Sequence, residues 1–166
     1  DAVGDDNAVL NGFTITGGNA SSSPGRGGGM YNLDCSPIVE HCVFHNNSAA
    51  GNGAAISNNG GVPLIRRCKI EFNSTTNSHG GGIANIEAGD SIDEPVVISE
   101  VLFIANTAGV GGSGNGGGIY VYEGGTNKDR GGYYHSLTTN TITVGRHSFD
   151  WAADSLRVRI WIVGSN

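Results

Sequence analysis

The chain has 166 residues, the length of one domain with a single core, which leaves little room for an elaborate second module. Its 29 glycines, four prolines and 14% charged residues exclude collagen and a disordered polyelectrolyte, and they suit a chain that turns often. A formal charge of -6 with nine Lys and Arg residues argues against nucleic-acid binding, and no apolar run is long enough to span a bilayer as a helix.

The chain repeats itself with a period of about 26 residues, as solenoids do. Each repeat has apolar residues two or three positions apart, followed by a glycine-rich block. In chain order the apolar residues are Leu10, Phe13, Ile15; Val39, Cys42, Phe44; Ile65, Cys68, Ile70; and Ile98, Val101, Phe103. The glycine-rich blocks are residues 27–32, 53–58, 80–85 and 116–121. The copies differ mainly in the lengths between these blocks, which is typical of loops on a solenoid.

Apolar positions two apart in such short blocks indicate strands and not helices. Asn, Ser and Gly between the blocks favour turns. We expect three short strands and three turns in each rung, and parallel rungs stacked about 4.8 Å apart, so that like residues lie on like residues. The predicted inward columns are Leu10, Val39, Ile65 and Ile98, and Phe13, Cys42, Cys68 and Val101.

Asn47, Asn73 and Asn106 recur at one turn of successive repeats. In stacked rungs each side-chain amide can donate to the next and accept from the one before. Such an amide ladder stabilises strands that lie in register. The sequence therefore predicts a buried ladder of three asparagines.

Two short motifs resemble those of a known family. Residues 44–47 (FHNN) and 103–106 (FIAN) resemble the FxxN element, and residues 53–56 (GAAI) and 80–83 (GGGI) the GGAI element, of repeats in bacterial polymorphic outer-membrane proteins. More broadly, residues 8–122 resemble right-handed parallel β-helix proteins of the pectate-lyase-like superfamily. The first copy departs from the pattern by having Gly18 where the ladder asparagine belongs. The resemblance implies one all-β, right-handed parallel β-helix of about five rungs, at a bacterial cell surface or secreted.

The two ends of the chain depart from the repeat. Residues 1–7 are expected to be a polar tail too short to cover a rung, so the chain would be a piece of something longer, or self-associate through its N-terminal rung. Residues 8–122 form the regular rungs, 123–135 a long exposed loop, and 136–166 an irregular last rung. Helical spacing predicts a short helix that caps the open end, over Phe149, Ala152, Ala153 and Leu156.

Several charged residues should meet on adjacent rungs. Two cross-rung ion pairs are predicted, Glu40 with Arg66 and Arg67 with Glu100, which would be solvated pairs of small energy. His45 and Glu71 share an outward slot, with Lys69 two residues away. This patch is a candidate for acid-base catalysis, and a structural role is the favoured alternative.

Four acidic residues, Glu87, Asp90, Asp93 and Glu94, follow the third glycine block and are candidate calcium ligands. No calcium-binding repeat is present, so a solvated acidic loop is the favoured alternative and no cofactor is predicted. Cys35, Cys42 and Cys68 lack the spacing of a zinc site and are expected to be buried thiols.

Four aromatic residues form the candidate ligand-binding set, Tyr120, Trp161, Tyr133 and Tyr134. We expect Tyr120 and Trp161 to stack on the outer face of neighbouring rungs, with the other two on the nearby long loop. Aromatic faces with few neighbouring charges suit a sugar, and they equally suit a loop that packs on a β-face. The predicted function is a secreted or cell-surface module with a binding or structural role, with a glycan as the candidate partner.

The rival function is a carbohydrate-active enzyme, a polysaccharide lyase or hydrolase. It would act in a groove beside the loops 109–115 and 123–135, with an acid and a base drawn from Glu123, Lys128, Asp129, Arg130 and His135. The sequence leaves open whether these side chains converge. A third interpretation is that the chain is a truncated fragment with no activity of its own.

Overall fold

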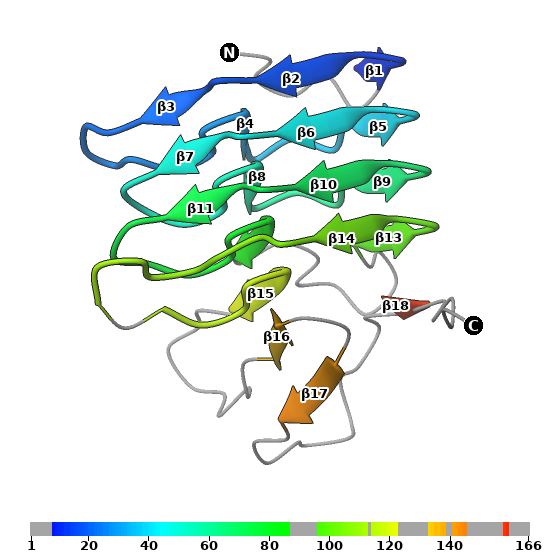
Figure 1. The fold of residues 1–166 in the computed structure, drawn as a ribbon. Helices are drawn as coiled ribbons and strands as arrows, with labels where there is room; N and C mark the ends of the chain where they lie inside the picture. The colour runs from blue at the N-terminus through cyan, green and yellow to red at the C-terminus, as the bar shows by residue number, and fades with distance from the viewer. Residues whose placement is uncertain are drawn as a thin grey trace, which may run out of the picture.

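A computed structural model describes residues 8–86, 96–112 and 114–122, together with the backbone of three later strands, Tyr133–Thr138, Thr141–Gly145 and Val158–Arg159. All regular elements in these residues are strands, and they form four sheets. The chain winds as a right-handed coil, and its turns stack from the blue N-terminal end downwards, so that equivalent strands form the sheets (Figure 1). The predicted parallel β-helix is confirmed.

Four strands make one turn of the coil. Sheet A holds β1 (Val9–Asn11), β5 (Ile38–Glu40), β9 (Leu64–Arg66), β13 (Val97–Ser99) and β18 (Val158–Arg159). Sheet B holds β2 (Thr14–Thr16), β6 (Val43–His45), β10 (Lys69–Glu71) and β14 (Leu102–Ile104). Sheet C holds β3 (Asn19–Ala20), β7 (Ser48–Ala49) and β11 (Ser74–Thr75). Sheet D holds β4 (Met30–Leu33), β8 (Ile56–Asn59), β12 (Ile83–Ile86), β15 (Ile119–Tyr122), β16 (Tyr133–Thr138) and β17 (Thr141–Gly145).

Each of the first three turns has one strand more than the three predicted. The additional strands are those of sheet C, and each is two residues long. In the fourth rung this sheet is reduced to a single bridge from Thr107 to Ser74. Two residues are too few to produce a visible alternation of apolar and polar side chains, so the sequence did not reveal them.

The rungs lie in register, so that Leu10, Val39, Ile65 and Ile98 pair in sequence across sheet A as predicted. The core contains Val39, Phe44, Ile56, Ile65, Ile70 and Ile83, each fully buried. The second predicted column is correct for Cys42, Cys68 and Val101 and wrong for Phe13. Phe13 lies on the first rung and is 59% exposed. Its ring is larger than the thiols below it, and β2 is an edge strand of sheet B among the described residues, so a rung packs on only one side of Phe13 there.

The two corners that flank sheet B turn through left-handed residues at the same place in every rung. The corner before sheet B has Gly12, His41, Arg67 and Glu100, and the corner after it has Gly17, Asn46, Phe72 and Ala105, all with φ between 48° and 78°. Glycine occupies both places only in the first rung. A side chain in this region carries a backbone cost of about 1–2 kcal/mol, which the ladder bonds on either side offset.

The predicted amide ladder is present inside the second corner. Asn47 Nδ2 donates to Asn73 Oδ1 at 2.9 Å, and Asn73 Nδ2 donates to Asn106 Oδ1 at 2.9 Å. Each Oδ1 also accepts a backbone N–H of the preceding rung, and at the top Asn47 Oδ1 accepts from Gly18 N at 2.9 Å. The first rung therefore joins this ladder through the backbone N–H of Gly18, because glycine has no side-chain amide.

A second amide ladder lies inside sheet D. Asn32 Nδ2 donates to Asn58 Oδ1 at 2.7 Å, and Asn58 Nδ2 donates to Asn85 Oδ1 at 2.6 Å. It ends there, since Asn85 pairs with Val121 and the Asn85 Nδ2 atom is buried without a hydrogen-bond partner. The sequence aligned these asparagines, but their role in a ladder was not predicted.

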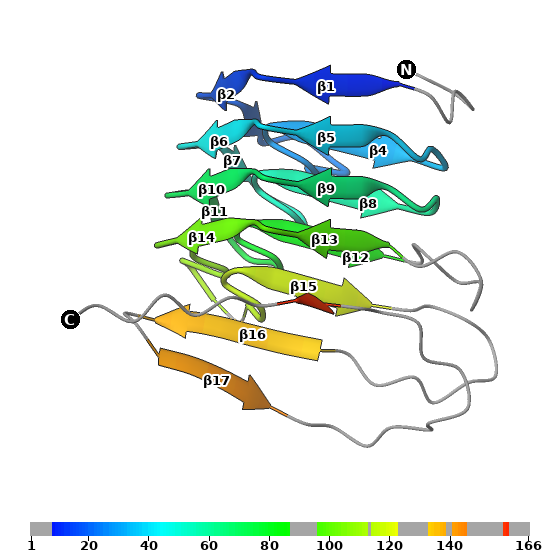
Figure 2. The ribbon, with the colours of Figure 1, turned by 90° about the vertical axis from the view of Figure 1, so that its right-hand side faces the viewer.

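The coil changes character after β15. Strand β16 pairs with β15 in the antiparallel sense, and β17 pairs with β16 in the same way, below the parallel rungs (Figure 2). Strand β18 returns beside β13 in sheet A, where a fifth rung would begin. Residues 133–135 were predicted to belong to a loop and instead open β16. The predicted capping helix at 149–156 lies outside the described residues.

Candidate functional site

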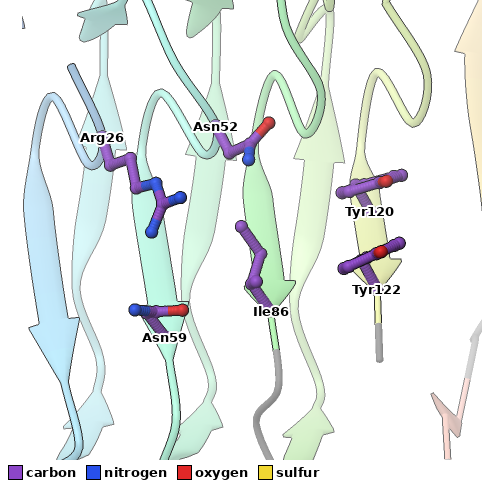
Figure 3. Close-up of a pocket in the computed structure, with 6 residues that line it drawn as sticks. All are labelled: Arg26, Asn52, Asn59, Ile86, Tyr120 and Tyr122. Carbon is purple, nitrogen blue, oxygen red and sulfur yellow. The ribbon is translucent and has the colours of Figure 1, made fainter. Parts of the chain in front are cut away.

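A hollow lies on the outer face of sheet D. It has a volume of about 380 Å³ and is lined by residues from four successive rungs: Arg26, Asn52, Asn59, Ile86, Tyr120 and Tyr122. Arg26 and Asn52 come from the loops that precede β4 and β8, and the other four come from the strands. Figure 3 shows Ile86 in the middle, with Arg26 and Asn59 on one side and the two tyrosine rings on the other.

The tyrosines form an aromatic wall. Tyr120 and Tyr122 point outward from alternate positions of β15, with rings parallel to within 8° and centroids 6.4 Å apart. The ring of Tyr120 also stacks on the imidazole of His79, with a centroid distance of 4.5 Å. Tyr120 is only 9% exposed, whereas Tyr122 is 48% exposed. Tyr120 and His79 therefore hold the wall in place, and Tyr122 offers a ligand the larger surface.

The loops that edge the hollow are fixed by side-chain hydrogen bonds. Asn52 Oδ1 accepts from Ser78 Oγ and from the backbone N–H of His79 at 3.2 Å. His79 Nδ1 in turn accepts the backbone N–H of Asn115 at 3.0 Å, which joins the loop of the third rung to that of the fourth. The hollow is thus bordered by bonded loops of successive rungs and is preformed.

The polar groups of the hollow are amides, phenols and one guanidinium. Arg26 is its charged residue, and no carboxylate of the described residues lines it. Amide and phenol groups both donate and accept hydrogen bonds, as sugar hydroxyl groups do. Aromatic rings offer apolar faces with a polar tip. This combination suits an uncharged or weakly charged polyhydroxylated ligand and gives no pair of groups for acid-base chemistry.

The predicted patch on the outer face of sheet B is present. Lys69 Nζ lies 2.8 Å from Glu71 Oε2, and His45 Nδ1 lies 3.5 Å from Glu71 Oε1. Asn46 Nδ2 lies 2.9 Å from His45 Nε2, so the amide donates to this nitrogen and the ring proton resides on Nδ1. The edge of the imidazole meets the ring of Phe72 with a centroid distance of 5.7 Å.

Both nitrogens of His45 are consequently engaged or buried. Nδ1 is inaccessible and makes no well-aligned hydrogen bond, because its distance to Glu71 is long. A general base must present a free nitrogen to a substrate, and neither nitrogen does so here. The geometry of this patch favours the structural role over catalysis.

The two predicted cross-rung ion pairs are also present. Arg66 Nη2 lies 2.6 Å from Glu40 Oε2, and Arg67 Nε lies 3.0 Å from Glu100 Oε2. The Glu40 carboxylate also accepts from Asn11 Nδ2 at 2.9 Å, so one chain of contacts joins the first three rungs. The second pair is more than half exposed at both ends and contributes little to stability.

The three cysteines are free and buried, as predicted. Cys42 Sγ donates to the backbone oxygen of Glu40 at 3.2 Å, and Cys68 Sγ donates to that of Arg66 at 3.2 Å. Desolvation by burial raises the pKa of Cys68 from 9.0 to about 11. A thiol held in this protonated form is a poor nucleophile, so these residues belong to the core.

Many of the other predicted site residues lie outside the described part of the chain. These are the acidic residues Glu87, Asp90, Asp93 and Glu94, the groove candidates Glu123, Lys128, Asp129 and Arg130, and the aromatic residue Trp161. For Tyr133, Tyr134 and His135 only the backbone of β16 is described. Tyr120 pairs with Tyr134 and Val121 with Tyr133, so three of the four predicted aromatic residues, Tyr120, Tyr133 and Tyr134, lie on strands of sheet D, which carries the hollow. Within the described residues, no group of three or more His, Cys, Asp or Glu could hold a metal ion.

Sequence reasoning identified Tyr120 and missed the rest of the hollow. The position of Tyr122, two residues further on a strand that exposes alternate residues, was the available signal. Asn59 and Ile86 could have been found from the same register, because both align with Tyr122. Arg26 and Asn52 lie on loops whose lengths differ between repeats, and no sequence pattern indicated their place.

Comparison of the chain with models of protein families, with curated proteins and with solved structures gave no match. No helix among the described residues is long and apolar enough to cross a membrane.

Proposed function

We propose that the chain is a glycan-binding module of a secreted or cell-surface protein, and that the hollow on sheet D is its binding site. The observation that carries the proposal is the preformed aromatic wall beside amide groups. Tyr122 is half exposed and its ring is held parallel to the buried Tyr120. An ordered aromatic face binds the apolar face of a sugar ring without a large loss of side-chain entropy.

The rigid scaffold supports this function. Most backbone groups near the hollow are committed to neighbouring rungs, as in the bonds from Gly53 N to His79 O and from Gly80 N to Asn115 O, each 2.9 Å. The site therefore needs little rearrangement on binding. The surface location rests on the likeness of the FxxN and GGAI elements to repeats of polymorphic outer-membrane proteins, and it stays a proposal together with that likeness.

The first experiment is a screen of the purified chain on immobilised glycans of diverse backbone, followed by titration of the best ligand. We expect Tyr122→Ala to weaken that ligand about tenfold, since it removes the stacking face. Tyr122→Phe is the matched control and keeps most of the affinity, because the ring remains. Circular dichroism and the thermal midpoint should not change in either variant. Absence of any binding across a broad panel contradicts the proposed function and leaves the inert fragment as the better interpretation.

A further inference from the structure

Among the four parallel strands of sheet D, β4, β8, β12 and β15, the bulky exposed side chains of the outer face lie on the first and the fourth. The strand pairings define two outward columns from the first rung to the fourth: Tyr31, Ser57, Ala84 and Tyr120 in one, and Leu33, Asn59, Ile86 and Tyr122 in the other. Each column has an aromatic residue at its fourth-rung end. At the first-rung end Tyr31 is 38% exposed and Leu33 is 50% exposed.

The strands between them carry no bulky exposed side chain on this face. Ser57 and Ala84 are fully buried and offer a ligand no surface of their own, and Ile86 is buried as well. Tyr31 and Tyr122 are three rung steps apart, which corresponds to about 14 Å along the coil axis, and Tyr122 lies two residues further along its strand. The hollow described above is the part of this face nearer to Tyr122, with Asn59 and Arg26 towards the first rung. Two aromatic surfaces thus stand on the first and the fourth of these parallel strands.

We propose that this face binds a linear glycan along the coil axis, with one sugar ring on Tyr122 and another on Tyr31. The inference rests on the proposed function and adds Tyr31 as a second subsite. A sugar unit in a linear glycan has a length similar to one rung step, so a chain that reaches both tyrosines contains about three or four units. The units between them lie over Asn59, whose amide can bond to hydroxyl groups, and over Ile86.

A dependence on ligand length follows from this geometry. A disaccharide reaches only one of the two tyrosines, so the other contributes nothing to its affinity. A longer chain contacts both, and the second contact adds no further cost of overall immobilisation. Affinity should therefore rise with chain length until both rings are covered and then level off.

The test is calorimetric titration with a series from disaccharide to hexasaccharide of the backbone found in the screen. We expect Tyr31→Ala to lower the affinity for the hexasaccharide about tenfold and to leave that for the disaccharide unchanged. Tyr31→Phe should behave as the unchanged protein, and the thermal midpoints of both variants verify that the coil remains folded. Tyr122→Ala should weaken binding at every length.

The outcomes separate this inference from the function on which it rests. If Tyr122→Ala weakens binding but Tyr31→Ala has no effect at any length, the second subsite is wrong and the glycan-binding function stands. An equal loss for the disaccharide and the hexasaccharide in Tyr31→Ala overturns the proposed orientation along the axis. If no oligosaccharide binds, the function and the inference are both wrong.

Discussion

Replacing Asn73 with alanine removes the central member of the first amide ladder. The Asn73 amide is fully buried and donates to Asn106 Oδ1 at 2.9 Å and to the backbone oxygens of Phe44 and Glu71, each at 3.0 Å. Its Oδ1 accepts both the backbone N–H and the Nδ2 of Asn47, each at 2.9 Å. Alanine can replace none of these interactions.

The expected cost follows from what is left unsatisfied. Asn47 Nδ2 keeps its bond to Ile15 O at 3.0 Å, but the buried backbone N–H of Asn47 loses its acceptor. A buried donor without a partner costs about 1–3 kcal/mol, and each lost bond contributes about 1 kcal/mol before relaxation. We therefore expect the free energy of unfolding to fall by about 2–4 kcal/mol, a large part of the total for a single domain.

Urea denaturation followed by circular dichroism measures this change. A loss of that size lowers the urea midpoint by about 1 M or more, with an unchanged slope. Asn77→Ala is the matched control, because Asn77 is an exposed loop asparagine and its replacement should alter stability by less than about 0.5 kcal/mol. Equal midpoints for the two variants would refute the role assigned to the ladder.

Three further predictions concern the corners, the core and the first rung. Ala105→Gly should raise the free energy of unfolding by about 0.5–1 kcal/mol, because Ala105 has a φ of 48° that glycine adopts without strain; a lower urea midpoint contradicts this. Cys68 should react with a thiol reagent only on unfolding. The pKa of the Cys68 thiol is about 11 in the folded chain, above its ordinary value of 9.0. The stability that the protonated thiol contributes is therefore present below pH 9 and is lost as the pH rises to about 11. Labelling of the native protein at pH 8, or a free energy of unfolding that does not change over this pH range, would contradict this prediction. Sedimentation should detect self-association through the edge strands β1 and β2, where Val9 and Phe13 are exposed. The variant Phe13→Ser should weaken this self-association. A monomer at all concentrations would exclude it.

The parts of the fold that repeat were predictable from sequence. In a parallel stack, residues at equivalent places in successive repeats must be neighbours. This alone placed Asn47 on Asn73 and Glu40 beside Arg66, because the partner of each residue can be counted along the chain.

The parts that do not repeat were not predictable. The antiparallel pairing of β16 on β15 breaks the period, so counting along the chain assigned Tyr133 to a loop. Phe13 occupies a core position by alignment, but it lies beside β2, an edge strand among the described residues, and is 59% exposed. The hollow depends on Arg26 and Asn52, which lie on loops outside the repeated blocks.

The fixed corners have a consequence for how proteins of this design can change. Every rung turns through left-handed residues at the same two places, and the loop variation lies elsewhere. A whole turn can therefore be duplicated or deleted without disturbing the pairing of the turns that remain. Each such event alters the length of the outer face by one step of about 4.8 Å. Duplication or deletion of a turn therefore changes the distance between Tyr31 and Tyr122 by a whole number of rung steps. A point mutation changes only the side chain at one end.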